Sequence, residues 1–423
     1  MESRNRFLDD LAKIASSTAS TIAGMKDEAE NLIKQRVEAL MNDMNLVTRE
    51  EFEVMNAMLS KARLEQEKLI KRIEALEKPS TKQNAKKPRK KSAVAKKMVA
   101  PGKGILAADE SSGTIKKRFD SINVESTEDN RMNYRRILFE TEEAMKNYIS
   151  GVILFDETIR QSNKEGKKLV DIISEAGSLP GIKVDMGAKE LAMMSGETVT
   201  EGLDGLRERL EEYSSLGAKF AKWRAVIAIS DEIPSPLCID TNSHALARYS
   251  ALCQEAGIVP IVEPEVLMDG SHSIERCYEV TKNTLTKVFD DLVKHKVDLT
   301  GICLKPNMVI DGKDSSKKSS PEEIANMTIN CFKETVPSEV PGIVFLSGGQ
   351  SEVEATENLN AINKIEGTPW NLSFSYGRAL QASALQAWQG LQENEEECSK
   401  AFSHRAKMNS LATKGMWTKD QEN

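Results

Sequence analysis

The sequence predicts an α/β protein, a (β/α)8 TIM barrel preceded by an all-α helical and coiled-coil module. From residue 98 onward, short apolar runs alternate eight times with amphipathic helical segments, which is the pattern of a parallel barrel. Polar or ionisable residues follow these runs. Between residues 52 and 76, apolar residues recur at three- and four-residue steps, which favours a coiled coil. We therefore expect a module over 1–78, a linker over 79–93 and the barrel over 94–423.

The eight predicted strands are short and mostly apolar, as expected of strands covered on both faces. They occupy residues 104–108, 151–155, 181–184, 220–223, 259–262, 301–304, 342–346 and 372–375. The helical segments between them have clear start signals. Ser320, followed by Pro321 and Glu323, is one example.

The N-terminal module contains a capping box and a heptad seam. Thr48 and Glu51 can each satisfy a free N–H at a helix start. The seam residues that follow are Phe52, Met55, Leu59, Ala62, Gln66, Leu69, Ile73 and Leu76. One helix cannot bury such a seam, so the pattern predicts self-association. The helical pattern over 4–46 suits either a membrane surface or packing against another helix.

The linker lies within a basic stretch, because residues 79–97 hold eight Lys or Arg side chains and no acid. We interpret this stretch as a flexible tether. Together with residues 1–24, it could also be attracted to an anionic membrane surface. Nucleic acid is not an expected partner, since the whole chain carries a net charge of −7 and no aromatic residue interrupts the basic stretch.

Several classes of protein are excluded. No apolar run approaches the roughly 20 residues of a membrane span, and Asp9 and Asp10 stand where a signal peptide would be apolar. Six scattered cysteines without a C-x-x-C pair indicate free thiols. We expect a cytoplasmic protein, with peripheral attachment at the inner face of the membrane as an added option.

The residues at or just beyond the predicted strand ends are the main functional signal. They are Asp109, Glu157, Asp185, Lys222, Glu263, Lys305, Ser347 and Arg378. The carboxyl ends of barrel strands meet on one face, where barrel enzymes carry out their chemistry. Eight such residues around one rim predict an active site.

Two of these residues suggest carbonyl chemistry through a lysine amine. Lys305 and Lys222 could lower each other's pKa and so expose a neutral amine, although a structural ion pair is the alternative for either one. Asp109, Glu263 and Glu265 could transfer the protons that imine chemistry requires.

A phosphate site is expected after the last two strands. Ser347, Gly348 and Gly349 offer consecutive backbone N–H groups, and Arg378 offers a bidentate cation. These loops are the usual phosphate site of barrel enzymes. No metal or nucleotide cofactor is expected, because the four histidines are not spaced as ligands and no glycine-rich nucleotide motif is present.

Residues 94–417 resemble class I fructose-bisphosphate aldolase in collinear order. The motifs that carry the resemblance are Pro101-Gly-Lys-Gly-Ile-Leu-Ala-Ala-Asp-Glu-Ser111, Phe220-Ala-Lys-Trp-Arg224, Val259-Pro-Ile-Val-Glu-Pro-Glu265, Leu304-Lys-Pro-Asn-Met308, Leu346-Ser-Gly-Gly-Gln-Ser351 and Ser375-Tyr-Gly-Arg-Ala-Leu-Gln381. The resemblance implies reversible, metal-independent cleavage of fructose 1,6-bisphosphate to dihydroxyacetone phosphate and glyceraldehyde 3-phosphate, in glycolysis and gluconeogenesis. It also implies a barrel tetramer.

The same resemblance implies individual roles. Lys305 would form the imine, Glu263 would shuttle protons and Asp109 would accept the proton during C–C cleavage. Lys222 would lower the pKa of Lys305 and stabilise the carbinolamine. Residues matching the C1-phosphate site are Ser347, Gly348, Ser375, Gly377 and Arg378; those lining the substrate and far phosphate are Lys183, Arg224, Ser111 and Thr114.

The first 78 residues resemble the bacterial coiled-coil accessory proteins of ubiquinone biosynthesis, also described as membrane-fusogenic. Arg4-Asn-Arg-Phe-Leu-Asp-Asp-Leu11 and Leu46-Val-Thr-Arg-Glu-Glu-Phe52 carry this resemblance. It implies a trimeric coiled coil and membrane association. Two alternatives remain for the whole chain: another Schiff-base barrel such as a transaldolase, and a membrane-linked scaffold that carries the barrel as a passenger.

Overall fold

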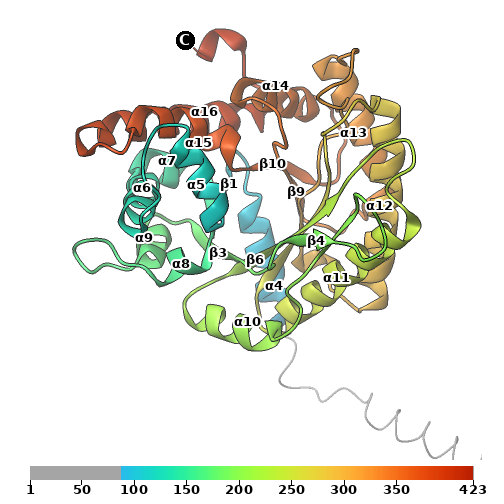
Figure 1. Ribbon diagram of the computed structural model, residues 1–423, viewed down its shortest axis with the longest axis horizontal. Coiled ribbons are helices and arrows are strands. Elements are labelled where there is room, and N and C mark those ends of the chain that lie inside the picture. Colours follow the sequence, from blue (N-terminus) through green and yellow to red (C-terminus); the bar gives the residue numbers. More distant parts are fainter. Residues whose placement is uncertain (1–86, 423) are drawn as a thin grey trace, which may run out of the picture. The chain divides into compact units, whose positions relative to one another are not determined.

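The computed structural model describes residues 87–422, and the predictions for the helices, seam and linker residues up to 86 lie outside this range. Eight parallel strands close into a barrel in the order β1-β10-β9-β8-β7-β6-β3-β2 (Figure 1). Their bounds are β1 (Gly104–Ala108), β2 (Ile149–Leu154), β3 (Leu179–Lys183), β6 (Phe220–Ile227), β7 (Val259–Val266), β8 (Cys303–Leu304), β9 (Gly342–Phe345) and β10 (Asn371–Tyr376). The predicted barrel is confirmed, and each of the eight apolar runs overlaps one strand.

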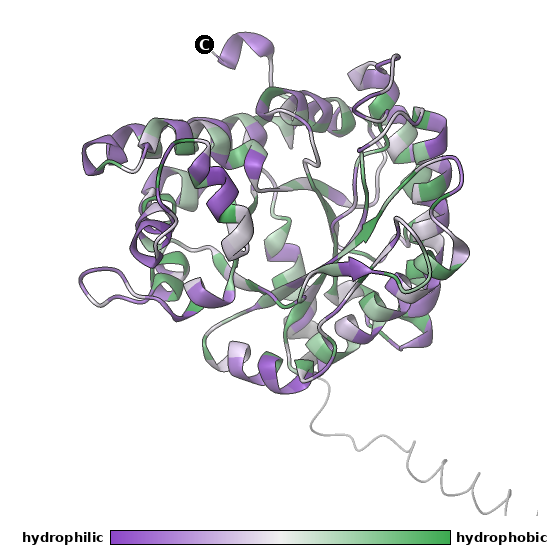
Figure 2. Cartoon of the chain, viewed as in Figure 1, coloured by the Kyte–Doolittle hydropathy of each residue, from purple (hydrophilic) through white to green (hydrophobic). Residues whose placement is uncertain are grey.

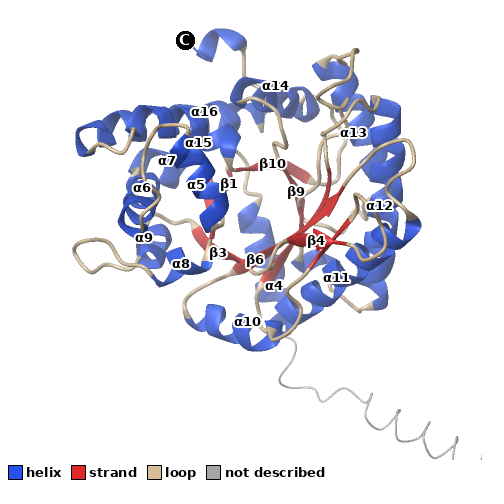
Figure 3. Ribbon diagram, viewed as in Figure 1, coloured by secondary structure: helices blue, strands red, loops and turns tan. Residues whose placement is uncertain are grey.

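Helices surround the barrel on its outside, as Figure 3 shows. They are α5 (Ser112–Asp120), α6 (Glu128–Glu140), α7 (Glu142–Asn147), α8 (Asp156–Arg160), α9 (Leu169–Glu175), α10 (Leu206–Ser215), α11 (Pro236–Glu255), α12 (Ile274–Lys294), α13 (Pro321–Thr335), α14 (Glu352–Asn363), α15 (Arg378–Trp388) and α16 (Glu395–Ala412). Short 3-10 turns η1 (Leu299–Gly301), η2 (Gln392–Asn394) and η3 (Lys419–Glu422) and a β4 (Ala188–Glu190)–β5 (Thr198–Thr200) hairpin complete the described chain. The predicted cap of α13 is present, because Ser320 Oγ accepts from the N–H of Glu323 at 3.2 Å.

The basic linker was predicted to extend to residue 93, but α4 (Lys87–Met98) begins six residues earlier. The physical reason is an apolar face on this helix: Ala95 and Met98, one turn apart, are buried, and Val94 packs beside them. They pack with Val99 against barrel residues such as Phe220 and Val344. The sequence pattern did not indicate this helix, because lysines dominate its composition and its apolar residues are few.

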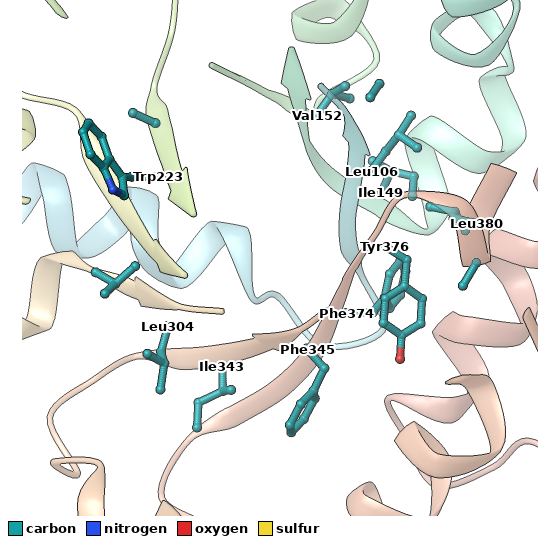
Figure 4. Close-up of a cluster of buried hydrophobic side chains, with 14 of the residues drawn as sticks. Leu106, Ile149, Val152, Trp223, Leu304, Ile343, Phe345, Phe374, Tyr376 and Leu380 are labelled. Atoms are coloured by element: carbon teal, nitrogen blue, oxygen red, sulfur yellow. The ribbon is translucent and has the colours of Figure 1, made fainter. Parts of the chain in front are cut away.

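Inward and outward residues alternate along each strand, and this separates two cores. On β1, Ile105 and Ala107 belong to the cluster inside the barrel, whereas Leu106 and Ala108 pack against the helices. Figure 4 shows part of the outer cluster, including Trp223, Phe345 and Tyr376. In Figure 2 the surrounding helices carry both hydrophobic and hydrophilic turns, as expected of elements with one buried face.

Candidate active site

The strand alternation brings the predicted residues to the inside of the barrel. On β6, Phe220 belongs to the inner cluster, so Lys222 and Arg224 are the next two inward positions. On β7, Val259 and Ile261 are followed inward by Glu263 and Glu265. The same step of two leads from Ala107 to Asp109 and from Cys303 to Lys305.

Two of these residues lie deeper than predicted. Lys222 and Glu263 were placed at strand ends, but both lie within longer strands, since β6 continues to Ile227 and β7 to Val266. The pairing register sets Lys222 beside Lys183 on β3 and Arg224 beside Glu263 on β7. The parallel ladder therefore aligns the cations and acids in layers.

A buried ionic cluster forms the floor of the site. Lys305 Nζ lies 3.0 Å from Glu263 Oε1, and Lys222 Nζ lies 2.7 Å from Asp109 Oδ2. Lys222 also lies 3.6 Å from Glu263 and 3.9 Å from Asp185. Lys222, Glu263 and Lys305 expose 4% or less of their surface, so few waters compete with these contacts.

The electrostatics fix the charge of two members of this cluster. Burial alone would raise the pKa of Asp109, but the ammonium groups of Lys222, Lys305 and Lys183 hold that pKa well below its usual range. Burial would likewise lower the pKa of Lys222, yet Asp109, Glu263 and Asp185 raise it well above its usual range. Asp109 is therefore a carboxylate and Lys222 an ammonium near neutral pH.

Fifteen residues were predicted to act in catalysis or to bind substrate and phosphate, and 14 of them line a cavity of about 540 Å³ above the cluster. They are Asp109, Ser111, Thr114, Lys183, Lys222, Arg224, Glu263, Glu265, Lys305, Ser347, Gly348, Ser375, Gly377 and Arg378. The exception is Gly349, which does not line the cavity. Its N–H donates instead to Met268 Sδ at 2.8 Å.

One part of the cavity wall is suited to an anion. Gly348 adopts a left-handed φ of 55°, and its carbonyl accepts from Arg378 Nη2 at 3.3 Å. Ser375 Oγ is buried in the wall and has no hydrogen-bond partner among the described residues. A bound phosphate oxygen would satisfy this hydroxyl.

Helix α5 and the residue that precedes it, Ser111, form another part of the cavity wall. Ser111 and Thr114 hydroxyls lie 3.1 Å apart, and Lys117, Arg118 and Ser121 follow at helical spacing. The last three, with Glu110, were not predicted as site residues. The signal in the sequence was that Lys117, Arg118 and Ser121 follow Thr114 by three, four and seven residues, which places all of them on one face of a helix. Arg118 forms an ion pair with Glu110, as Arg224 does with Glu265.

One other sequence interpretation needs correction. Glu157 was counted with the active rim, but it does not line the cavity, because its carboxylate is held by Arg131 at 2.9 Å and by Arg135 at 3.6 Å. His272, one of the four histidines, is 8% exposed and lies in the loop after β7.

Within residues 87–422, no group of three or more His, Cys, Asp or Glu side chains is arranged to hold a metal. In the same range, no helix has the length and apolarity to cross a membrane.

The chain matches known proteins along most of its length. Residues 91–423 match the family model for class I fructose-bisphosphate aldolase, and residues 2–78 match a model described as membrane fusogenic activity. A probable class 1 fructose-bisphosphate aldolase of Xanthomonas axonopodis pv. citri is 56% identical over 324 residues, 76% of this chain and 97% of that protein. Cytosolic fructose-bisphosphate aldolase 4 of Arabidopsis thaliana is 57% identical over 76% of this chain and 82% of its own.

A solved structure agrees with both fold and family. Fructose-bisphosphate aldolase of Plasmodium falciparum, crystallised with TRAP and a small-molecule inhibitor, has a TM-score of 0.78 and 48% identity. The match covers 80% of this chain and 98% of that one. These matches decide against a transaldolase. Together with the eight-stranded parallel barrel and the buried lysines on its floor, the matches show that the chain belongs to the class I fructose-bisphosphate aldolases.

Proposed function

We propose that this aldolase acts through an imine at Lys305, without a metal or organic cofactor. The observation that carries the proposal is the 3.0 Å contact between Lys305 Nζ and Glu263 Oε1 on the floor of the cavity. A lysine must lose a proton before it attacks a carbonyl carbon, and a carboxylate at this distance can accept that proton. The protonated Glu263 can then return it as the carbinolamine loses water.

The proposed cleavage step uses Asp109. Once the imine is formed, its cationic nitrogen can accept the electron pair of the breaking C–C bond, while a base removes the proton of the neighbouring hydroxyl. Asp109 is suited to this role because Lys222 keeps it ionised. The Lys222 ammonium, 3.6 Å from Glu263, can also stabilise the carbinolamine oxygen. Glu265 holds Arg224 by an ion pair and serves to orient it.

The substrate is proposed to lie across the cavity with a phosphate in each cationic part. Ser347, Gly348, Ser375, Gly377 and Arg378 would hold the phosphate on C1. Ser111, Thr114, Lys183 and Arg224 would line the remaining substrate and the far phosphate. Lys117 and Arg118 add two cations to the same wall.

Trapping tests the mechanism directly. Borohydride added with dihydroxyacetone phosphate reduces an imine to a stable amine, so we expect one labelled peptide containing Lys305 and complete loss of activity. Lys305→Met should be inactive and unlabelled, and excess EDTA should leave the wild-type rate unchanged. Labelling at another lysine, or cleavage by Lys305→Met, would refute the mechanism.

For the N-terminal module we propose self-association through the 52–76 seam, together with contact between an anionic membrane and residues 1–24 and 79–97. The match of residues 2–78 to the membrane-fusogenic family supports this. A cytoplasmic location, at the inner face of the membrane, is consistent with the cytosolic relative from Arabidopsis and with six buried free cysteines. Cosedimentation with vesicles containing phosphatidylserine, but not with phosphatidylcholine vesicles, is expected for the full chain. It should be weaker after removal of residues 1–78, which leaves only the basic residues 79–97.

A further inference from the structure

A methionine from another strand contacts the back of the proposed phosphate loop, residues 347–349. The N–H of Gly349 donates to Met268 Sδ at 2.8 Å. Met268 lies two residues beyond the end of β7, whereas the loop follows β9. Ser347 and Gly348 line the large cavity and Gly349 does not, so this N–H is turned away from the cavity.

The backbone around Met268 is itself fixed by a neighbouring loop. The Met268 carbonyl accepts from Lys313 N–H at 2.7 Å, and the Gly270 carbonyl accepts from Asp314 N–H at 2.9 Å. The His272 carbonyl accepts from Gly312 N–H at 2.9 Å. A flexible methionine side chain can set the position of another loop only if its own backbone is held, and these three bonds hold it.

The fit between Met268 and the loop is tight. A Cβ added at Gly349 would lie 2.6 Å from Met268 Sδ, and one at Gly348 would lie 3.6 Å from the same sulfur. The space behind the loop is a cavity of only about 10 Å³. This volume holds one water at most, so the loop is supported almost entirely by protein atoms.

We propose that Met268 is a positioning residue for phosphate binding. By accepting the Gly349 N–H, its sulfur fixes the loop so that Ser347 and Gly348 face the cavity beside Arg378. The proposal rests on the proposed function of this loop as the C1-phosphate site. A thioether is a weak acceptor, so the expected contribution is that of one modest hydrogen bond plus the packing behind the loop.

The first test is Met268→Leu, which nearly preserves side-chain volume and removes the acceptor. We expect the KM for fructose 1,6-bisphosphate and the inhibition constant of inorganic phosphate to rise about three- to tenfold. We expect kcat to stay within about twofold, because the imine-forming Lys305 directly follows β8 and its N–H is held by the Val262 carbonyl, away from this loop. Met327→Leu is the matched control: Met327 is another partly buried methionine, on α13, and its replacement should change neither constant.

A second pair of variants tests the contact itself. Gly349→Ala should raise KM more than Met268→Leu does, because the new methyl group collides with the sulfur. In Gly349→Ala/Met268→Ala the collision is removed, and KM should return to the value of Met268→Ala alone. If the two substitutions instead multiply each other's effects, the proposed contact is wrong.

Arg378→Ala separates this proposal from the one on which it rests. A raised KM in Arg378→Ala with an unchanged KM in Met268→Leu would overturn the positioning role and leave the phosphate site standing. Unchanged KM in both variants would overturn both proposals together.

Discussion

Lys222 donates to Asp109 across the barrel floor at 2.7 Å, which makes this lysine the hub of the buried charges. Its ammonium also lies within 4 Å of Glu263 and Asp185. Lys305, by contrast, has a single carboxylate partner within ion-pair distance, Glu263, among the described residues. The two lysines therefore differ in surroundings, and the three carboxylates around Lys222 raise its pKa and keep it a cation.

Replacing Lys222 by Met should destabilise the fold strongly. Asp109, Glu263 and Asp185 would lose their shared cation, and leaving a buried charge without a partner costs roughly 3–5 kcal/mol. We expect a clear fall in Tm and loss of cleavage activity. Lys282→Met is the matched control, because Lys282 pairs with Glu334 at 2.5 Å on the surface and its loss should leave Tm nearly unchanged. Equal losses of Tm in the two variants would contradict the assignment of Lys222 as the hub.

Arg378→Ala should weaken substrate binding. Arg378 is exposed, so the loss of its charge-assisted bonds is expected at about 1–2 kcal/mol, or roughly a five- to thirtyfold rise in KM. Because the proposed site binds the phosphate on C1, fructose 1,6-bisphosphate and fructose 1-phosphate should be affected alike. Steady-state kinetics on both substrates measures this. A rise for the bisphosphate alone would assign Arg378 to the far phosphate instead.

Acid should destabilise the protein through His272. Burial lowers the pKa of this histidine, so the folded chain binds the proton less readily than the unfolded chain. Asp311 opposes this effect, whereas Arg276 and Lys318 add to it. Stability is therefore unaffected well above pH 6.5 and falls as the pH drops below that value towards the lowered folded-state pKa.

The variant His272→Gln should flatten this part of the stability curve. Urea unfolding between pH 5 and pH 7.5 is the measurement, and His244→Gln, at an exposed position, is the control. An equal slope in His272→Gln and the wild type would show that other groups cause the acid sensitivity.

The sequence predicted the barrel from the alternation of apolar runs with helices, and most of its site from polar residues near the strand ends and from the aldolase motifs. The two-residue period of a strand explains why these residues share the inside of the barrel. Once Phe220 is placed inside, Lys222 and Arg224 must follow it, and the same holds for Ile261, Glu263 and Glu265. The features of the site that the sequence did not predict depend on contacts between elements that lie far apart in the chain. The Gly349 N–H, for example, donates to Met268, 81 residues away.

The other omissions have the same origin. Lys117 and Arg118 reach the cavity only because α5 packs over the barrel mouth, an orientation that helical periodicity alone does not specify. In α4, the lysines dominated the composition, while the three apolar residues that seat the helix against the barrel were too few to produce a strong pattern.

The last prediction concerns assembly, in which the two parts of the chain favour different symmetries. The relatives of the 52–76 seam imply a threefold coiled coil, whereas the aldolase family implies a tetramer of twofold symmetry. A four-chain particle cannot satisfy both. Because α4 begins at Lys87, only residues 79–86 separate it from the module, and eight extended residues span at most about 28 Å. A connection this short restricts which copies of the chain each part can associate with. If the module forms trimers and the barrel forms tetramers, each contact links further chains, so we expect the full chain to form assemblies larger than a tetramer.

Removing residues 1–78 should lower the particle mass to that of the barrel assembly and leave kcat nearly unchanged, since every described residue that lines the cavity lies between Ala107 and Arg378. The barrel should fold without the module, because the Xanthomonas aldolase matches this chain over 97% of its own length within 324 residues. Light scattering on both forms measures the mass, and the steady-state cleavage rate measures kcat. An unchanged number of subunits would show that the seam does not organise the assembly. A lowered mass with a large fall in kcat would show instead that the module supports the active site.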